Sequence, residues 1–357
     1  MRVSVNMGTD PEFFIFERIG NKHKIITADK VLPGKENKLS YYEGKVFFDG
    51  VQAEINPRAN TCRETVAGYI KKLLEKAYIE TTKKYDNVVF APLGTIKLTK
   101  EDLVGVDGEC LRFGCSPDMN IYSGDSLDYP NGKRFLYRFS GGHIHIGFNT
   151  SSFQTVMKEK MKVQKLIKML DAVVGTMSVA LVPTRMEKFR RNFYGKPGTF
   201  RIQPHGMEYR TLSSFWMVSP QMQSLIFGLV RDCFTYSAKG MDDKYLSKFD
   251  MDEVVRVISE SDVKGAKDIY NDIIKPNYIY SRDKINNSPM RHKVVRDLVD
   301  IMIDKGSNYI FNPYNMLKYW EITGNGLYGS WDNRMGIWKF AYDIQNEFFT
   351  PDGVREL

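Results

Sequence analysis

The chain has 357 residues, of which 42% are hydrophobic and 26% charged, as in ordinary soluble globular proteins. Lysine and arginine outnumber aspartate and glutamate by 51 to 43, but no block of five like charges occurs, which argues against a disordered basic arm for nucleic acid. The chain has no apolar signal core and no apolar run near the roughly 18 residues of a membrane span, so we expect a cytoplasmic protein. Its four cysteines fit no CxxC or zinc spacing and are expected to be reduced thiols.

The chain up to about residue 216 shows the alternation of β-strands, interrupted by two helices. Residues 3–16 predict a strand with Asp10 and Glu12 on one face, and Pro11 between them indicates a strand start or a sheet edge. Further strands are expected over residues 46–56, 87–93, 138–148, 200–203 and 207–212. Helices are expected over residues 60–85 and 152–182, the second with a break near Gly175.

After residue 219 the apolar periodicity becomes helical. Helices are expected over residues 222–236, 252–259, 263–274, 292–304 and 315–320. We therefore predict an α+β protein with a sheet-rich domain, residues 1–240, and a mostly helical C-terminal region, residues 241–357. The helical region could equally pack as part of the same domain.

The predicted strands share pairs of polar residues two positions apart, which a strand places on one face. These pairs are Asp10 and Glu12, Glu54 and Asn56, His143 and His145, Arg201 and Gln203, and Glu208 and Arg210. If the strands are neighbours, this face is a cradle of carboxylates, imidazoles and guanidinium groups. Carboxylates suit Mg²⁺ or Mn²⁺, Mn²⁺ also tolerates imidazole, and the guanidinium fork matches phosphate oxygens.

The residue types divide into a metal-binding and a phosphate-binding set. The carboxylates available for metal ions are Asp10, Glu12, Glu54 and Glu208. The cations available for phosphates are Arg191, Lys196, Arg201 and Arg210. The cations come from residues 190–216, where the turn Gly195–Gly198 could also present backbone amides, although it is not the P-loop pattern.

Each pair also has an ordinary structural interpretation. Asp10 and Glu12 could be a strand-end cap and a surface charge, and Glu54 could be a buried salt-bridge partner. One histidine of an HxH pair is more often a core residue than a ligand, and adjacent arginines usually form a solvated face. Glu208 and Arg210 could form an ion pair that only stabilises. Their shared parity on several strand-like segments favours a nucleotide and metal site.

Six motifs occur in order between residues 8 and 216: GTDPEFF, VLPGK, DGVQAEINP, GCSPDMN, SGGHIHIG and RRNFYGKPGTFRIQPHGMEYRTLSSFW. In these motifs the chain resembles the phage amidoligase type 2 family, the carboxylate–amine ligases similar to that of phage phiEco32. That family is placed with glutamine synthetase and the glutamate–cysteine ligases. The last motif is specific, and the shorter ones support it together. No motif of the family is recognised after residue 216.

The resemblance implies a curved antiparallel β-sheet cradle with helices on its outer face, the glutamine synthetase-like catalytic fold. It implies ATP and Mg²⁺ or Mn²⁺ on the inner face, in a phage enzyme that works in the host cytoplasm. The expected partners are a small-molecule, peptide or protein carboxylate and an amine. Nucleic acid is a less favoured partner, a membrane is not expected, and the oligomeric state is open.

The resemblance also assigns roles to individual residues. The implied metal ligands are Asp10, Glu12, Glu54, Glu208 and His145, with His143 beside the nucleotide. The implied phosphate contacts are Arg201, Arg210 and one or both of Arg191 and Lys196. Asp118 and Asn120 would lie at the amine or carboxylate pocket. Asp10 departs from the glutamate of many relatives, and its shorter side chain could shift metal contact to Glu12.

The predicted function is an ATP- and metal-dependent carboxylate–amine ligase that works through an acyl phosphate. In this scheme Glu54 holds metal, and Arg201 and Arg210 stabilise the transferring phosphoryl group. Asp118 or Glu208 takes the ammonium proton. One alternative is a phosphotransferase of the guanidino-kinase type. The other is a non-catalytic phage protein, structural or associated with nucleic acid, on the same fold.

Overall fold

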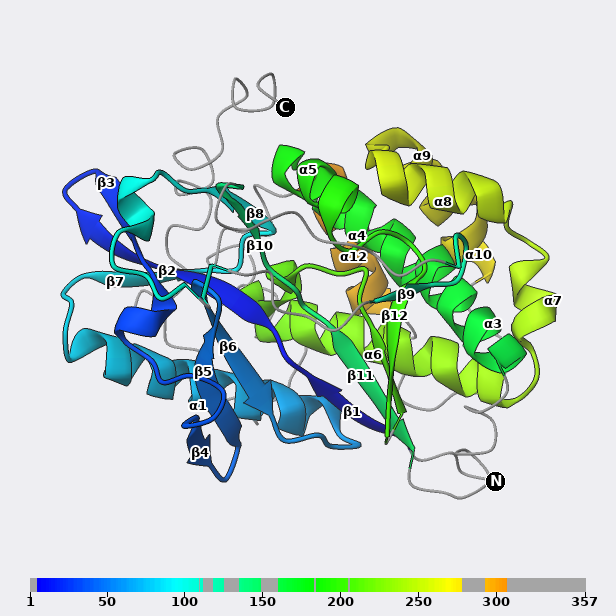
Figure 1. Cartoon of the computed structure of the whole chain (residues 1–357). Helices are drawn as coiled ribbons and strands as arrows, with labels where there is room; N and C mark the ends of the chain where they lie inside the picture. The colour runs from blue at the N-terminus through cyan, green and yellow to red at the C-terminus, as the bar shows by residue number, and fades with distance from the viewer. Residues whose placement is uncertain are drawn as a thin grey trace.

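The computed structural model describes residues 5–108, 110–111, 118–124, 135–148, 160–182, 184–204, 206–277 and 293–306. These residues form an α+β structure in which a curled antiparallel half-barrel of strands carries helices on its outside (Figure 1). The predicted class and the curved antiparallel sheet are therefore confirmed. None of the helices in the described ranges is both long and apolar enough to cross a membrane.

The strands form two large sheets and one small one. The five-stranded sheet has, in order, β1 (Val5–Thr9), β11 (Ile144–Phe148), β13 (Gly206–Tyr209), β12 (Thr199–Gln203) and β9 (Met119–Asn120). The six-stranded sheet has β3 (Lys22–Ile26), β2 (Glu12–Ile19), β6 (Gln52–Pro57), β5 (Gly44–Asp49) and β4 (Leu39–Tyr41), with β7 (Val88–Ala91) also on β2. The small sheet pairs β10 (Tyr137–Phe139) with β8 (Thr95–Lys97).

The junction between β1 and β2 joins the two large sheets. The prediction of one strand over residues 3–16 is wrong, because the chain leaves one sheet at Asp10 and enters the other at Glu12. Pro11 has no N–H for a ladder, as its position between the strands requires. Its carbonyl accepts from the Ile55 amide at 3.2 Å. Asp10 therefore does not share a strand face with Glu12.

Two other segments, each predicted as one strand, form two strands in the structure. Residues 46–56 fold as the β5–β6 hairpin, which turns at Gly50 with φ +65°, and the preceding Asp49 completes the Asp-Gly signal of such hairpins. Residues 138–148 divide into β10 and β11 around Gly141-Gly142. A Cβ on Gly142 would lie 2.2 Å from the Ser213 carbonyl oxygen, so only glycine fits this crossing. The predicted strands at 87–93, 200–203 and 207–212 are confirmed as β7, β12 and β13.

The predicted helices are confirmed wherever they lie in the described residues; the prediction at 315–320 lies outside them. The α-helices are α1 (Arg63–Thr82), α3 (Lys160–Leu170), α4 (Thr176–Leu181), α5 (Arg185–Phe193), α6 (Pro220–Ala238), α7 (Asp242–Leu246), α8 (Met251–Glu260), α9 (Val263–Ile269), α10 (Lys275–Asn277) and α12 (Lys293–Lys305). Two π-helical segments, Asp171–Gly175 and Tyr270–Ile274, follow α3 and α9, and the first is the break expected near Gly175. Short 3₁₀ turns cover Ala28–Lys30, Glu101–Leu103 and Ser214–Val218.

The helices bury the apolar face of the sheets. Helix α1 packs on β5 and β6, and α6 packs on α1 and α3 (Figure 1). Strand β13 shows the division of faces, because Tyr209 reaches the helices and bonds Asp171 at 2.8 Å. Glu208, one residue earlier, therefore points to the opposite, concave face. The charged pairs predicted on the strands gather on this concave side.

The helices after residue 240 pack against earlier ones. Helix α9 contacts α4, and α8 contacts α4 and α5. The Arg191 guanidinium of α5 reaches Ser261, which ends α8, at 2.7 Å. The domain boundary at residue 240 stays a prediction.

Candidate active site

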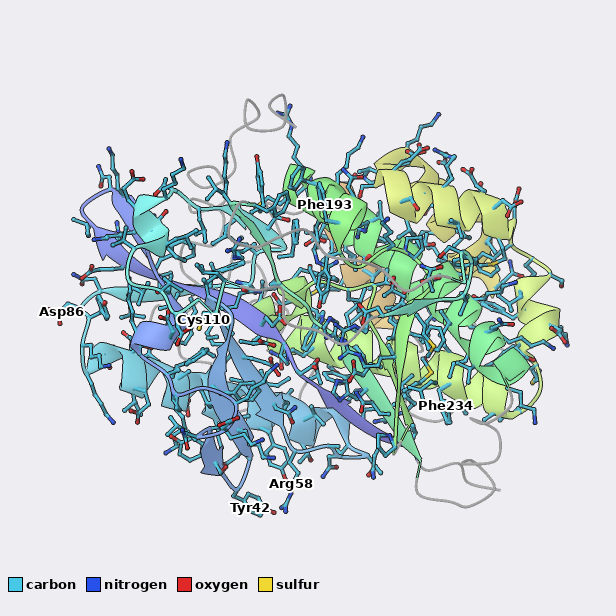
Figure 2. The ribbon with its side chains drawn as sticks, in the orientation of Figure 1. Tyr42, Arg58, Asp86, Cys110, Phe193 and Phe234 are labelled. Atoms are coloured by element: carbon cyan, nitrogen blue, oxygen red, sulfur yellow. The ribbon has the colours of Figure 1, made fainter. Side chains whose placement is uncertain are left out.

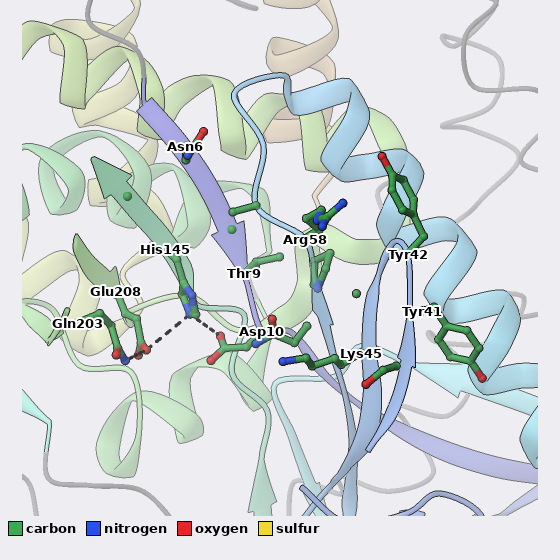
Figure 3. Close-up of a pocket in the computed structure, with 17 residues that line it drawn as sticks. Asn6, Thr9, Asp10, Tyr41, Tyr42, Lys45, Arg58, His145, Gln203 and Glu208 are labelled. Atoms are coloured by element: carbon green, nitrogen blue, oxygen red, sulfur yellow. Dashed lines mark hydrogen bonds and ion pairs between the residues drawn. The ribbon is translucent and has the colours of Figure 1, made fainter. Parts of the chain in front are cut away.

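One group of metal-competent side chains comes from the five-stranded sheet and its junction. Asp10, His145 and Glu208 each present a ligand atom, and these atoms lie within 4.8 Å of one another (Figure 3). His145 and Glu208 are cross-strand neighbours on β11 and β13, which fixes them on one face. The His145 Nε2 atom lies 3.2 Å from Asp10 Oδ1 and 3.7 Å from Glu208 Oε1. We call these three residues the histidine group.

A second group comes from the six-stranded sheet. Glu12, Asp49 and Glu54 also have ligand atoms within 4.8 Å of one another, and Glu12 and Glu54 are cross-strand neighbours. Two hydrogen bonds hold Glu12 Oε2: one from the Gly141 amide at 2.7 Å and one from Gln52 Nε2 at 3.2 Å. We call Glu12, Asp49 and Glu54 the carboxylate group.

The carboxylate group is poorly compensated by cations. Burial and then the Asp49 charge raise the pKa of Glu12 to about 8. Burial and then the Asp10 charge raise the pKa of Glu54 well above its ordinary value. The ammonium of Lys35 reaches this group from outside, in contact with Asp49 and 3.9 Å from Glu54, but its side chain is half exposed. Three crowded carboxylates of this kind favour a bound cation over a second proton.

Asp10 in the histidine group behaves in the opposite way. Burial alone would raise its pKa, but His145 and then His143 hold the pKa of Asp10 well below its ordinary value. His143 lies before β11, and its Nδ1 is 3.1 Å from Asp10 Oδ1. Its Nε2 is 2.8 Å from the Tyr194 hydroxyl. Because both ring nitrogens contact protein groups, His143 orients Asp10 and is less suited to hold a ligand itself.

Two arginines flank Glu208 on the side away from Asp10. Arg210 is 1% exposed, with Nη1 2.7 Å from Glu208 Oε2 and Nε 2.8 Å from Asp118 Oδ1. Its Nη2 donates to the Tyr194 hydroxyl at 3.1 Å. Arg201 is 21% exposed, 2.9 Å from Asp118 and 3.6 Å from Glu208. Asp118 is fully buried and holds the two guanidinium groups together.

Two predicted phosphate contacts do not join these groups. The Arg191 guanidinium is buried among the helices, where it bonds Ser178 at 3.1 Å and Ser261. It supports helix packing, which explains the basic pair at 190–191 in structural terms. Lys196 lies in the predicted turn, and its carbonyl accepts from Thr199 and Thr211.

Four residues of the site were not predicted from the sequence. Asp49, Gln52, Lys35 and Tyr194 were not nominated, although each contacts a nominated side chain. The Asp-Gly pair at 49–50 was the available signal for Asp49, because a hairpin there places it opposite Gln52 and beside Glu54. The contact of Tyr194 with His143 joins residues 51 positions apart and has no local signal.

A cavity of about 750 Å³ opens beside the histidine group. Asp10, His145 and Glu208 form one end of its lining (Figure 3). Its other end is lined by the β4–β5 hairpin and the residues after β6, including Lys45 and Arg58. Buried ionisable groups with shifted pKa values at a cavity are typical of an enzyme active site.

A match to a protein family supports the interpretation that the protein is an enzyme, and it indicates the class of enzyme. Residues 122–254 match the sequence model of the family described as "Phage phiEco32-like COOH.NH2 ligase-type 2". The match supports a carboxylate–amine ligase, which forms C–N bonds, and it confirms the resemblance that the motifs indicated. No curated protein matches the chain.

The extent of the match changes one expectation. It continues to residue 254, so the likeness to the family does not stop at residue 216 as the motifs suggested. It includes the histidines, Arg201, Glu208 and Arg210, but begins after the positions of the carboxylate group, Asp10 and Asp118. The family match therefore does not cover the carboxylate group, which rests on the geometry of the structure and on the GTDPEFF and DGVQAEINP motifs.

Proposed function

We propose that the protein is an ATP- and divalent-metal-dependent carboxylate–amine ligase that works through an acyl phosphate. The observation that carries the proposal is the convergence of the histidine and carboxylate groups at the Asp10–Glu12 junction, beside Arg201 and Arg210. Two adjoining anionic groups next to guanidinium groups suit a metal-bound polyphosphate. The glutamine synthetase-like fold belongs to the same proposal.

The residues present fit divalent metal ions. His145 Nε2 is buried and faces Asp10 Oδ1 at 3.2 Å and Glu208 Oε1 at 3.7 Å, so one ion could be shared by all three side chains. The carboxylate group offers hard oxygen donors and gains from neutralisation. Asp10, His145 and Glu208 would hold one ion, and Glu12, Asp49 and Glu54 another. Bound ions would neutralise the phosphate oxygens and hold them in line for transfer.

The proposed reaction has two steps. A carboxylate oxygen of one substrate attacks the γ-phosphorus of ATP, the bond to ADP breaks, and an acyl phosphate forms. The amine then attacks the acyl carbon, the C–O bond to phosphate breaks, and an amide remains. Arg201, which is partly exposed, is the guanidinium placed to contact the transferring phosphoryl group. Arg210 is buried beside it and keeps Asp118 and Glu208 in position.

The amine must lose a proton as it attacks. Of the two carboxylates nominated for this role, only Glu208 lines the cavity. Asp118 is fully buried and does not line the cavity. We therefore assign proton acceptance to Glu208.

The test combines nucleotide binding with trapping of the acyl phosphate. The full chain is titrated calorimetrically with a non-hydrolysable ATP analogue, with and without Mn²⁺. It is then incubated with ATP, Mg²⁺, a carboxylate mixture and hydroxylamine as a general amine. We expect Mn²⁺-dependent binding, and formation of hydroxamate, ADP and free phosphate.

Glu54→Gln should abolish both results, whereas Glu17→Gln, on the same strand as Glu12 but outside both groups, should leave them unchanged. A phosphorylated acceptor without free phosphate would identify a phosphotransferase instead. Absence of nucleotide binding would favour a non-catalytic protein.

A further inference from the structure

We propose that the cavity beside the histidine group binds a second carboxylate of the substrate, through Lys45 and Arg58. The substrate class would be a linear molecule with two carboxylates, one at the histidine group and one at the far end of the cavity. The identity of the reacting end rests on the proposed function. The anion site itself is a separate claim and is tested without turnover.

The far end of the cavity carries positive charge that the described part of the chain does not neutralise. Lys45 and Arg58 line the cavity and form no ion pair with any described residue. The nearby carboxylate of Glu43 is bound by Lys72 of α1 at 3.1 Å. The backbone amide of Arg58 donates to the Glu43 carbonyl at 2.7 Å, so the acid is adjacent but its charge is directed elsewhere. An anionic ligand would supply the missing partner.

Both cations are placed to reach such a ligand. Lys45 is the cross-strand neighbour of Asn56, on the face that carries Glu54, and its side chain points into the cavity toward Asp10 (Figure 3). Asn56 is two residues from Glu54, which places it about 7 Å further along the strand. Arg58 lies across the cavity from His145 and Glu208, so a small molecule could extend between them (Figure 3).

Aromatic contacts hold Arg58 at the rim of the cavity. Its guanidinium lies 5.0 Å from the centre of the Tyr42 ring, and Figure 2 shows the two residues together at the edge of the molecule. Tyr42 in turn meets Tyr69 of α1 edge-on at 6.1 Å. Stacking of this kind orients the planar guanidinium for a forked contact with a carboxylate.

A nucleotide polyphosphate would also be attracted to two cations, but the structure favours a carboxylate. The guanidinium groups that suit phosphate, Arg201 and Arg210, do not line the cavity. A phosphate bound at the partly exposed Arg201, outside the cavity lining, would leave the cavity for the other substrate. The cavity volume is that of a site for a small organic molecule.

The experiment compares linear dicarboxylates, from glutarate to suberate, with the monocarboxylates of equal length. Binding to the full chain is measured calorimetrically in the presence of Mn²⁺. We expect the best dicarboxylate to bind about tenfold more tightly than its monocarboxylate, since it gains one charge-assisted contact. Lys45→Met and Arg58→Met should each remove most of this preference, and Lys45→Arg should retain it. Lys24→Met, which removes an exposed strand lysine outside the cavity, is the matched control.

The proposal is overturned if no dicarboxylate exceeds its monocarboxylate, or if the preference survives both methionine variants. It is also overturned if Lys45→Met and Arg58→Met weaken binding of the non-hydrolysable ATP analogue instead, because the cavity would then hold the polyphosphate. Failure of hydroxamate formation with intact dicarboxylate preference would count against the ligase reaction and not against this site.

Discussion

The histidine and carboxylate groups are neighbours, but the charges of their buried carboxylates are compensated in different ways. In the histidine group the acids Asp10 and Glu208 face imidazoles and Arg210. In the carboxylate group Glu12 and Glu54 lie against each other and Asp49, with neutral donors on Glu12 and a half-exposed lysine beside Glu54. The first group is preorganised by the protein, whereas the second, under the proposed function, would be completed by a bound cation. Substitution, pH and metal should therefore act on the two groups in opposite directions.

The largest effect should come from Arg210→Met. It leaves the buried carboxylates of Asp118 and Glu208 with the partly exposed Arg201 in place of two shared cations. Removing one partner of a buried ion pair costs about 3–5 kcal/mol, and we expect a loss of this size in the free energy of unfolding from urea titration. Arg201→Met, at a partly exposed position, should cost less than half as much. Equal losses would show that the buried network does not depend on Arg210.

The pH dependence of the metal-free protein should report the carboxylate group. The pKa of Glu12 rises from 4.5 to about 8 in the folded state. The folded state therefore binds the proton more tightly, and this stabilisation is complete below pH 4.5 and is lost as the pH rises through about 8. The shift corresponds to at most about 5 kcal/mol, and we expect roughly 2–3 because water enters partly buried clusters.

The measurement is the melting temperature between pH 5 and 8.5, in EDTA and in Mn²⁺. Stability should fall with pH in EDTA, and Mn²⁺ should restore it most at the alkaline end. Asp10, whose pKa is lowered, has the opposite sign and loses its contribution only in acid. A flat profile in EDTA would contradict the charge crowding inferred for Glu12 and Glu54.

Replacing a glutamate by neutral glutamine should change the free energy of unfolding in opposite directions in the two groups. At alkaline pH, where the Glu54 carboxyl of the metal-free protein is ionised, Glu54→Gln removes a repelled charge, so the free energy of unfolding should rise by about 1 kcal/mol, while stabilisation by Mn²⁺ is lost. Glu208→Gln removes the partner of Arg210 and should lower stability by about 2 kcal/mol. Denaturant titration without metal checks both, and a destabilised Glu54→Gln protein would mean that Lys35 already compensates the carboxylate group.

The smallest effect should come from Tyr194→Phe. It removes the hydroxyl that contacts His143 and Arg210, at a cost of about 1 kcal/mol. Because His143 orients Asp10, the affinity for Mn²⁺ should fall a few-fold. Tyr270→Phe removes a tyrosine–carboxylate bond away from the site and should lower stability without changing Mn²⁺ affinity. An unchanged Mn²⁺ affinity in Tyr194→Phe would show that the tyrosine does not act through His143.

The helices and the types of residue in the site were predictable, but the path of the chain was less so. Helical periodicity identified α1, α6, α8 and α12 because each has an apolar face several turns long. Strand alternation continues across a tight turn, which is why the turns at Gly50 and Gly141-Gly142 were read as strand interiors. Asp49 was not predicted for the same reason, because it enters the site only when β5 folds back on β6.

Residue type was also a weak guide to which cation meets the acids. Arg191 and Arg210 look equivalent in the sequence, but α5 directs Arg191 to the serines of α4 and α8. Arg210 follows β13 directly and so stays beside Glu208. The distinction depends on helix packing over long sequence separations, which no local pattern contains.

The Asp10-Pro11-Glu12 junction makes the spacing of the two groups a fixed length. Two residue steps span at most about 7 Å, so cations held by Asp10 and Glu12 cannot be drawn far apart. The Glu12 end is also held in place, because the Glu12 amide donates to the Gly141 carbonyl at 2.9 Å. An inserted residue would lengthen this connection and would let the Asp10 and Glu12 carboxylates move apart. The tripeptide therefore limits the distance between the two groups.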